Sequence, residues 1–441
     1  MLPSSLSGAV SALVGYGRAH RSLAARLRLE GAEVYAFDRS EDARALAEQD
    51  GVPGEFGEGY LEALGALRPA YAFITPGMRK DLSAFADLAA RGTQLTSETA
   101  FFFARRRRPV LAITGSAGKT TTTTLCGRIL ARQGIAAAVC GNIGRPLSQA
   151  LWDEEEIALY VAELSSFQLQ NLTASPEIAG LLNIRPNHLD IHPTFEDYAD
   201  SKWRIARYQD ASGVVVLPVD LLHSARDLPG EVRSFSARED ADATLRGDLL
   251  TLHGRPLAER ASLLLPGRHN VENALAAALL SEAAGAEDAA IAREIQVFGG
   301  VPHRLELVAL RAGVRFVNDS IATAPDRTMA AFDALEGPFV WLAGGYDKHL
   351  DYRGLVQQLH GVKLACLFGP VGMTLLGLLR GVGVAAEHYP AFDDAVRHAL
   401  SAAVPGDTVL LSPAAASYDS FRSYEERGER FRQLVAENAP Q

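Results

Sequence analysis

The chain lacks most of the features that mark secreted, membrane-spanning or redox-active proteins. Its 441 residues include only three cysteines, Cys126, Cys140 and Cys366, and their spacing forms no metal-binding or redox pair. We therefore expect three separate, reduced thiols. No apolar run approaches the roughly 20 residues that cross a bilayer, and residues 1–8 carry no basic segment like that of a secretory signal. These absences predict a cytoplasmic protein with no membrane partner.

An excess of positive charge is also lacking. The chain has 43 Lys and Arg against 53 Asp and Glu, which gives a net charge of -10. Proteins that bind nucleic acid usually present a basic surface to the phosphates, so we expect no nucleic-acid partner. One basic run occurs at residues 105–108, four arginines followed by Pro109. We predict that this run is a solvated linker.

A candidate phosphate-binding loop is present at residues 110–120, where a buried apolar strand, a glycine turn and a helix start follow one another. Gly115 and Gly118 let the backbone turn its N–H groups toward a polyphosphate. Lys119 adds a positive charge, and the hydroxyl of Thr120 can hold magnesium. The two glycines are one residue closer than in the strict Walker A spacing. The strand, the helix and the Gly-Lys-Thr run nevertheless favour nucleotide binding over a chance βα turn.

Strand-like and helix-like stretches alternate through most of the chain, which is typical of parallel sheets covered by helices. A length of 441 residues predicts about three domains. Residues 213–266 differ, because short strands with turn signals predict an antiparallel meander there. We therefore expect an α/β protein with a Rossmann-like domain at 1–106, a central P-loop ATPase-type domain with an added antiparallel sheet at 107–300, and a Rossmann-like domain at 301–441.

Polar side chains follow the predicted strands of the central domain, where parallel sheets bind their ligands. Glu163 closes a strand next to the phosphate loop and suits a Mg²⁺ ligand. His188 follows the next strand, and this position favours a functional role over that of an ordinary loop histidine. Lys202 lies in a predicted helix, where a lone lysine is normally solvated. Asn270 and Asn273, at the start of another helix, suit either base recognition or capping of that helix.

Strand ends in the two outer domains carry further candidates. In the first domain, Gly15 and Gly17 form a tight turn and Asp38 follows the next strand, as in part of a dinucleotide fingerprint. His20 occupies the third glycine position of that fingerprint, so the turn is either a diphosphate site or a structural corner. In the third domain, polar clusters at residues 318–320, 344–348 and 412–417 follow three strands and mark one edge as a binding face.

The combined motifs resemble those of the Mur ligase family over nearly the whole chain. The phosphate loop is similar to the family's G-[TS]-N-G-K-[ST]-T, which accounts for the close glycines. The Glu-Leu-Ser-Ser-Phe-Gln run and the later Ser-Pro-Ala-x-Ala-Ser are similar to those of the member that adds D-glutamate. The motifs that carry the resemblance, in family order, are residues 115–121, 141–144, 163–169, 187–190, the helix with Lys202, 267–273, 302–304, 318–320 and 411–421.

The resemblance implies an ATP-dependent ligase of peptidoglycan precursor synthesis that joins D-glutamate to UDP-N-acetylmuramoyl-L-alanine. ATP would phosphorylate the substrate carboxylate, and the D-glutamate amine would attack the acyl phosphate through a tetrahedral intermediate. The catalytic residues implied are Lys119, Glu163, His188 and Lys202. Two Mg²⁺ ions are implied, one held by Thr120 and a second by Glu163 and His188, with a carbamylated Lys202 as an oxygen ligand. We expect a monomer.

The resemblance also assigns the remaining binding residues by position. Those assigned to ATP are Gly115, Ser116, Gly118, Lys119, Thr120, Thr121, Asn142, Asn270, Asn273, Arg304 and Asp319. Those assigned to the UDP-linked substrate are Gly15, Gly17, Asp38, Arg39, Thr75, Gly77, Ser165 and Gln168. Those assigned to D-glutamate or its surroundings are Thr323, Lys348, Ser417 and Phe421.

The sequence departs from the family pattern at four positions. Ala117 replaces an asparagine of the phosphate loop, Ala415 replaces a cysteine, and His20 replaces a glycine. Ile321 stands where the family usually has lysine, and a hydrocarbon cannot replace a cation near an acidic substrate. Two alternatives therefore stay open. One is another Mur or folylpolyglutamate-type amide ligase, and the other is a degenerate, non-catalytic sensor of nucleotide or UDP-sugar.

Overall fold

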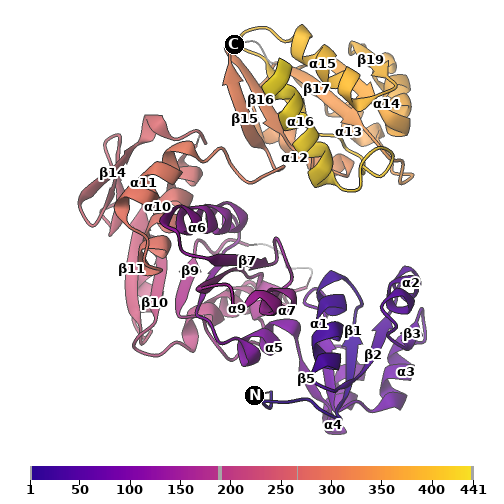
Figure 1. Ribbon diagram of the computed structural model, residues 1–441, viewed down its shortest axis with the longest axis vertical. Helices are drawn as coiled ribbons and strands as arrows, with labels where there is room; N and C mark the ends of the chain where they lie inside the picture. The colour runs from indigo at the N-terminus through magenta and orange to yellow at the C-terminus, as the bar shows by residue number, and fades with distance from the viewer. Residues whose placement is uncertain (1, 187–190, 266, 439–441) are drawn as a thin grey trace. The chain divides into compact units, whose positions relative to one another are not determined.

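The computed structural model describes residues 2–186, 191–265 and 267–438, and the chain forms two compact units, residues 1–297 and 298–441 (Figure 1). Within the described residues, the first unit contains two β-sheets and the second contains one. The predicted α/β class is confirmed. Each sheet lies inside one of the three predicted domains, whose exact boundaries stay a prediction. None of the described helices has the length and apolar character needed to cross a membrane.

The first sheet is parallel, with the strand order β3-β2-β1-β4-β5. Alternate residues of β1 face opposite sides, so Leu13 packs with Leu23 of α1 while Val14 packs with Phe85 of α4. The strands are β1 (Val10–Val14), β2 (Glu33–Asp38), β3 (Gly54–Phe56), β4 (Tyr71–Ile74) and β5 (Gln94–Thr96). The helices are α1 (Arg18–Leu29), α2 (Asp42–Gln49), α3 (Tyr60–Leu67), α4 (Ser83–Ala90) and α5 (Glu98–Arg105).

The second sheet has the order β14-β13-β12-β11-β10-β9-β6-β8-β7. Its buried centre is β6 (Val110–Thr114), which lies between β8 (Leu159–Glu163) and β9 (Ile178–Leu181). The other strands are β7 (Ala137–Gly141), β10 (Val214–Pro218), β11 (Glu231–Ser236), β12 (Ala243–Arg246), β13 (Leu249–Leu252) and β14 (Arg255–Glu259).

The predicted meander over residues 213–266 is wrong for its first half. Strands β10, β11 and β12 run parallel and extend the central sheet. Between β10 and β11 the chain crosses back through η2 (Val219–Ala225), so that β11 starts at the same edge of the sheet as β10. Antiparallel pairing begins only at β12, where Gly247 and then His253-Gly254, all at positive φ, form the short hairpin turns. The added antiparallel strands therefore belong to the same sheet as the phosphate loop.

Helices on both sides of the second sheet complete the central domain (Figure 1). The long helix α10 (Arg268–Ala283) is buried along most of its length and packs on α6 (Lys119–Gln133). Glu294 of α11 (Asp288–Val297) forms ion pairs with Arg128 and Arg132 of α6, which fixes the helix that follows the phosphate loop. The remaining elements are α7 (Leu147–Ala150), η1 (Leu151–Asp153), α8 (Ser166–Leu169), α9 (Phe195–Arg207) and η3 (Arg260–Ser262).

The arginine run at residues 105–108 is not simply a solvated linker. The side chains of Arg105 and Arg106 are largely buried, and Arg105 pairs with Glu30 of the first domain at 2.6 Å. Arg107 is exposed but pairs with the buried Glu154 of the central domain at 2.8 Å. The prediction failed because the carboxylate partners lie 47 or more residues away in the sequence.

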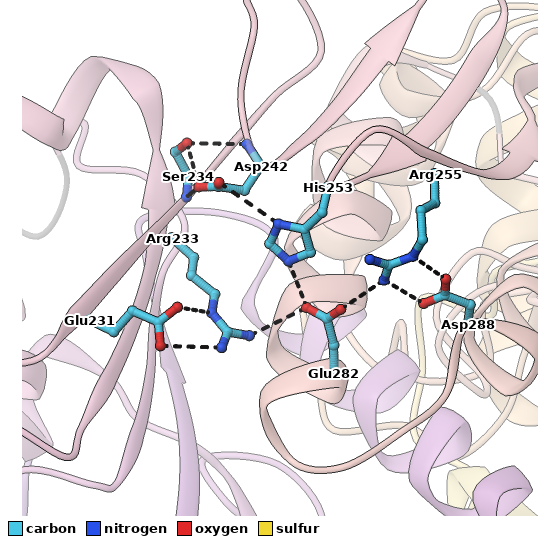
Figure 2. A network of polar contacts seen from close by, with 8 residues as sticks. All are labelled: Glu231, Arg233, Ser234, Asp242, His253, Arg255, Glu282 and Asp288. Carbon is cyan, nitrogen blue, oxygen red and sulfur yellow. Dashed lines mark hydrogen bonds and ion pairs between the residues drawn. The ribbon is translucent and has the colours of Figure 1, made fainter.

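A network of charged side chains ties the strands β11 to β14 to the helices α10 and α11 (Figure 2). Glu282, near the end of α10, accepts hydrogen bonds from Arg233 at 3.3 Å, His253 at 2.8 Å and Arg255 at 3.0 Å. Arg255 also pairs with Asp288 of α11 at 2.7 Å. Glu282 thus links three basic side chains from the extended part of the sheet, and Glu231, Asp242 and Asp288 each pair with one of them as well.

We expect the substitution Glu282→Gln to lower the stability of the central domain by about 1 kcal/mol, because the Glu282 side chain is 22% exposed and water screens the pairs. The thermal midpoint of this domain should fall by about 2–4 °C, and the difference should shrink in 1 M salt. Glu259→Gln, at an exposed position at the end of β14, is the matched control and should leave the midpoint unchanged. Equal midpoints for the two variants would contradict the role of the network.

The third sheet forms the second unit, with the order β15-β16-β20-β17-β18-β19. Strand β15 is an antiparallel edge that the sequence did not predict, whereas the other neighbouring pairs are parallel. The strands are β15 (Glu306–Arg311), β16 (Val314–Asn318), β17 (Phe339–Gly344), β18 (Val362–Phe368), β19 (Ala386–Tyr389) and β20 (Thr408–Leu411). The helices are α12 (Pro325–Ala334), α13 (Arg353–Gln357), α14 (Gly369–Gly381), α15 (Phe392–Ala402) and α16 (Tyr424–Asn438).

The cysteines Cys126, Cys140 and Cys366 are free, as the sequence predicts, and all three are buried. They lie on α6, β7 and β18, respectively. Burial raises the pKa of each thiol to about 12. The thiolate, which is the reactive form, is therefore disfavoured at all three positions in the folded protein.

Candidate active site

The predicted phosphate loop lies between β6 and α6, at the carboxyl edge of the central sheet. Gly118 begins α6 with φ at +84°, and a Cβ there would lie 2.3 Å from Oδ1 of Asn273. Nζ of Lys119 donates to the carbonyl of Gly115 at 2.8 Å and to that of Ser116 at 3.4 Å. This strand, glycine turn and helix start have the geometry of an anion-binding loop.

Asn183, just after β9, holds the phosphate loop in shape, and sequence reasoning missed it. Its backbone oxygen accepts from the N–H of Ser116 at 3.0 Å. Its side chain accepts from the N–H of Ala117 at 2.9 Å and donates to the carbonyl of Ala117 at 3.1 Å. The loop thus keeps its conformation with alanine at position 117. The position of Asn183 after a buried strand was the signal that could have identified it.

Glu163 ends β8 with its side chain 1% exposed, as the sequence predicts for a strand-end ligand. Oε1 accepts from Nδ2 of Asn142 at 2.7 Å, and the carbonyl of Glu163 accepts from the N–H of Asn142 at 2.9 Å. Among the described residues, Oε2 has no hydrogen-bond partner. Because an unpaired buried carboxylate oxygen costs free energy, this donor set fits a cation.

Lys202 lies in α9 and is only 1% exposed. The expectation that a lone lysine in a helix is solvated is therefore wrong here. Nζ donates to the carbonyl of Gly115 at 2.9 Å and lies 4.7 Å from the ring centre of Tyr198. Burial, and then the positive charge of Lys119, lower the pKa of Lys202 to about 7, although Glu163 opposes the shift. A large part of this lysine is therefore neutral at pH 7.

The fully buried His192 connects α8 to α9 through hydrogen bonds, and a separate hydrogen bond joins α9 to the phosphate loop. The two ring nitrogens of His192 contact Oγ of Ser166 at 3.0 Å and Oδ2 of Asp197 at 2.8 Å. The ring also packs edge-on against Tyr198, whose hydroxyl lies 2.8 Å from Oγ of Ser116. Sequence reasoning missed His192, since its partners come from two separate segments, α8 and α9.

The predicted substrate residues Ser165 and Gln168 form a capping box at the start of α8. Gln168 also lines a pocket of about 220 Å³ together with Lys80. Nζ of Lys80 donates to the carbonyl of Phe167 at 3.2 Å, and burial lowers the pKa of Lys80 to about 8. Lys80 is thus a second lysine with a lowered pKa, after Lys202, and the sequence did not point to it.

Asn270 and Asn273 lie in the first turns of α10 and contact each other at 3.3 Å. The N-cap of α10 is Gly267, so neither asparagine is the N-cap residue. Thr120 and Thr121, in the first turn of α6, are half-buried. His188 lies outside the described residues. Within those residues, no group of three or more His, Cys, Asp or Glu side chains is arranged to hold a metal.

The first domain brings Gly15, Asp38 and Thr75 together at the ends of β1, β2 and β4. A Cβ on Gly15, which has φ at +87°, would lie 2.5 Å from the Thr75 side chain. Asp38 accepts from the N–H of Tyr16 at 2.6 Å. His20 is buried against this turn, with Nδ1 2.6 Å from the carbonyl of Gly15, and burial lowers its pKa to about 4. The histidine thus packs under the turn where a glycine was expected.

Three other residues assigned to the UDP-linked substrate occupy the same edge. Gly17 is the N-cap of α1, and Arg39 is an exposed residue directly after β2. Gly77 belongs to the turn that follows β4. Their placement at the carboxyl ends of parallel strands matches the usual ligand edge of such sheets.

In the second unit, Asp319 follows β16 and is buried. Its carboxylate accepts from the N–H of Leu305 at 3.2 Å and from Oγ of Ser412 at 2.8 Å. Burial raises the pKa of Asp319 to about 6, while these hydrogen bonds and Arg304 act in the opposite direction. Asp319 and Arg304, both assigned to ATP by the resemblance, line one cavity.

The residues assigned to D-glutamate lie on three loops of this unit. The backbone N–H of Thr323 donates to the carbonyl of Ile321 at 2.8 Å. Nζ of Lys348 lies 6.0 Å from the ring centre of Tyr418. Ser417 is buried, and the ring of Phe421 packs against Phe392 with a centroid distance of 5.1 Å. Phe421 thus has at least a packing role.

Arg427, on α16, organises the loops after β16 and β20, and sequence reasoning did not detect it. The guanidinium is fully buried and donates to the carbonyls of Ser320 at 2.9 Å, Ala415 at 3.1 Å and Ala416 at 3.2 Å. Burial lowers the pKa of Arg427 to about 9, although Asp419 opposes this shift. Ala415 contributes only its backbone carbonyl to this contact.

Comparison with known proteins places these features in a family. The model of the Mur ligase middle domain matches residues 113–281, and that of the Mur ligase glutamate ligase domain matches residues 303–415. A UDP-N-acetylmuramoylalanine--D-glutamate ligase from Symbiobacterium thermophilum is 40% identical, with 96% of this chain and 97% of the relative covered. A protein of the same name from Solibacter usitatus is also 40% identical, with 98% of each chain covered.

Solved structures agree at the level of the fold. A UDP-N-acetylmuramoyl-L-alanyl-D-glutamate--2,6-diaminopimelate ligase matches with a TM-score of 0.54 at 18% identity, covering 99% of this chain and 94% of that one. A UDP-N-acetylmuramate-alanine ligase from Thermotoga maritima matches with a TM-score of 0.52 at 18% identity. The match covers 97% of this chain and 99% of that one. With relatives 40% identical along nearly its whole length, this chain belongs to the Mur ligase family.

Proposed function

We propose that this protein is an ATP-dependent ligase that adds D-glutamate to UDP-N-acetylmuramoyl-L-alanine and releases ADP and phosphate. The names of relatives that match along nearly the whole chain support both substrates. The geometric observation that carries the ATP chemistry is the carbonyl oxygen of Gly115, which accepts from both Lys119 and Lys202. One cation thus faces the phosphate loop, and an amine with a pKa near 7 lies beside it.

In the proposed reaction, the loop N–H groups and Lys119 hold the phosphates of ATP and offset their charge as the substrate carboxylate approaches. A carboxylate oxygen forms a bond to the γ-phosphorus while the bond from that phosphorus to ADP breaks. The amine of D-glutamate then attacks the acyl carbon, loses a proton, and phosphate leaves as the amide forms. Preorganised positive charge is the main contribution expected of the protein.

Mg²⁺ would supply further charge neutralisation between the two anions, and Thr120, Glu163 and His188 are the residues that would hold it. The buried Oε2 of Glu163, unpaired among the described residues, supports this assignment. Asn142 would fix the carboxylate through its hydrogen bond to Oε1.

We also propose that Lys202 is carbamylated. Its neutral amine would form a bond to the carbon of CO₂ and lose a proton, which converts a buried cation into an anion. The lowered pKa supports this step, because only the unprotonated amine has the lone pair that attacks. An anion beside Lys119 would also remove the repulsion between two lysines that share one carbonyl oxygen.

The other ligands are proposed at the strand ends of each sheet. The UDP end of the substrate would bind where Gly15, Asp38 and Thr75 meet. The positive φ of Gly15 and its contact with Thr75 leave no room for a side chain at position 15, so the backbone of this turn stays open to a ligand. D-Glutamate would bind near Lys348 and Ser417. We further propose a monomeric, cytoplasmic enzyme, in keeping with three free cysteines and an acidic composition.

The test is ADP release from ATP with UDP-N-acetylmuramoyl-L-alanine and a panel of D-glutamate, L-glutamate, L-lysine and diaminopimelate. We expect stimulation by D-glutamate alone, together with formation of the amide product. If D-glutamate is inert and another amino acid is active, the substrate assignment is wrong. If ATP and the UDP-linked substrate bind but no amino acid yields amide, the protein is the non-catalytic sensor instead.

A further inference from the structure

A cavity of about 290 Å³ lies in the second unit between the loop after β16 and helix α12. Its charged lining residues are Arg304, Asp319 and Arg327, and its other walls, Ile321 among them, are apolar. Both arginines line the same cavity as the Asp319 carboxylate, and the positive charge of each acts to lower the pKa of Asp319. Two guanidinium groups against one carboxylate leave a net positive cavity, which suits an anionic ligand.

Arg327 reaches back from the first turn of α12 to the loop that carries Ile321. Its Nη1 donates to the carbonyl of Ile321 at 3.4 Å, although the two residues are six positions apart. A guanidinium thus lies beside the backbone of the position where Mur ligases usually have lysine. Ile321 cannot provide a positive charge, but Arg327 of α12 brings one into the same cavity.

The first turn of α12 is fixed by the same serine that holds Asp319. Oγ of Ser412 donates to Oδ2 of Asp319 at 2.8 Å and lies 3.0 Å from the hydroxyl of Thr328. Thr328 follows Arg327 directly and is itself buried. The exposed Arg327 side chain therefore extends from an anchored backbone, which reduces the entropy lost when it orders around a ligand.

We propose that Arg327 replaces the missing lysine at position 321 and contacts an anionic group of a substrate, an inference that rests on the proposed ligase function. The chemistry recognised is a group with two or more anionic oxygens, because a guanidinium binds such groups through paired N–H donors. A phosphate of ATP and a carboxylate of D-glutamate both meet this description. The experiment below separates them.

The test compares Arg327→Ala, Arg327→Lys and the double variant Ile321→Lys/Arg327→Ala in the full-length protein. We expect Arg327→Ala to lower kcat/KM for one anionic substrate by about 10- to 100-fold, with an unchanged thermal midpoint. Arg327→Lys should lose less, and a lysine at position 321 should restore most of the activity lost in Arg327→Ala. Arg380→Ala, an exposed arginine on α14, is the matched control and should behave as the parent protein.

The ligand is identified by measuring KM for ATP and D-glutamate separately and by titrating ADP calorimetrically. A raised KM for ATP with weaker ADP binding assigns Arg327 to a phosphate, whereas a raised KM for D-glutamate alone assigns it to a carboxylate. Parameters within twofold of the parent for every ligand would overturn the inference. The inference would also be overturned if Arg327→Ala loses activity and the added Ile321→Lys substitution does not restore it. If the parent forms no amide, the proposed function fails. The inference is then tested by binding alone, and equal affinities of parent and Arg327→Ala for both ADP and D-glutamate overturn it independently.

Discussion

The variant Lys119→Ala should have almost no ligase activity, with kcat lowered by about a thousandfold or more, because one cation at a transferring phosphoryl group contributes several kcal/mol to the barrier. Nζ of Lys119 lies on the inside of the phosphate loop, 2.8 Å from the carbonyl of Gly115. Its loss has a second consequence. The charge of Lys119 helps to lower the pKa of Lys202, so the variant should hold Lys202 protonated at a higher pH.

The measurement is ADP release under single-turnover conditions with saturating substrates. Lys363→Ala is the matched control, since Lys363 pairs with Asp407 in the second unit and lies outside the proposed site. Thermal unfolding of both variants would show whether the fold is retained. Activity of Lys119→Ala within a few fold of the parent would refute the placement of ATP in this loop.

The variant Lys202→Ala should lose activity by a comparable factor, and short carboxylic acids such as acetate or formate should restore part of it. The reason is that an acid of this size can occupy the place of the proposed carbamate and present the same oxygens. Lys119→Ala is the control here, because a carboxylate cannot replace its positive charge. If no acid restores Lys202→Ala, carbamylation loses its support.

The pH dependence of activation follows from the pKa of Lys202, which is about 7. Above this pH the amine is mostly neutral and can react with CO₂, whereas below it the protonated form has no free electron pair. Enzyme depleted of CO₂ should therefore regain activity on addition of bicarbonate faster at pH 8 than at pH 6. Activity that is insensitive to CO₂ depletion at both values would contradict this mechanism.

Much of the site was predictable because phosphate loops combine several local signals. Gly115, Gly118 and Lys119 stand between an apolar strand and a helix, and each of these features is visible in a short segment. Glu163 was predictable for the same reason, as a charged residue at the end of a buried strand. Lys202 was different, since its helix reveals nothing of the carbonyl it contacts, and only the family resemblance singled it out.

The residues that escaped prediction act through contacts between distant segments. Asn183 forms hydrogen bonds with Ala117 of the phosphate loop, 66 residues earlier in the sequence. Arg427 contacts Ser320 across 107 residues, and on its own helix it is indistinguishable from a surface arginine. The parallel pairing of β10 and β11 was missed because the direction of a strand depends on its connection rather than on its own residues.

The departure at Ala117 now has a physical account. Its backbone is held at both polar atoms by Asn183, so the loop conformation does not require an asparagine at that position. For Ile321 the proposed account is different, because Arg327 would carry the missing charge. In both accounts, a neighbour in space takes the place of the usual residue.

The burial of the three thiols makes them reporters of local opening in the native protein. A thiol reagent can reach Cys126 on α6 or Cys140 on β7 only when the surrounding structure opens, so the rate of labelling reports the frequency of that opening. Cys366 reports separately on the second unit, while the first domain has no cysteine. Nucleotide bound at the phosphate loop should slow labelling at Cys126 and Cys140, which would allow occupancy of the site to be followed without turnover.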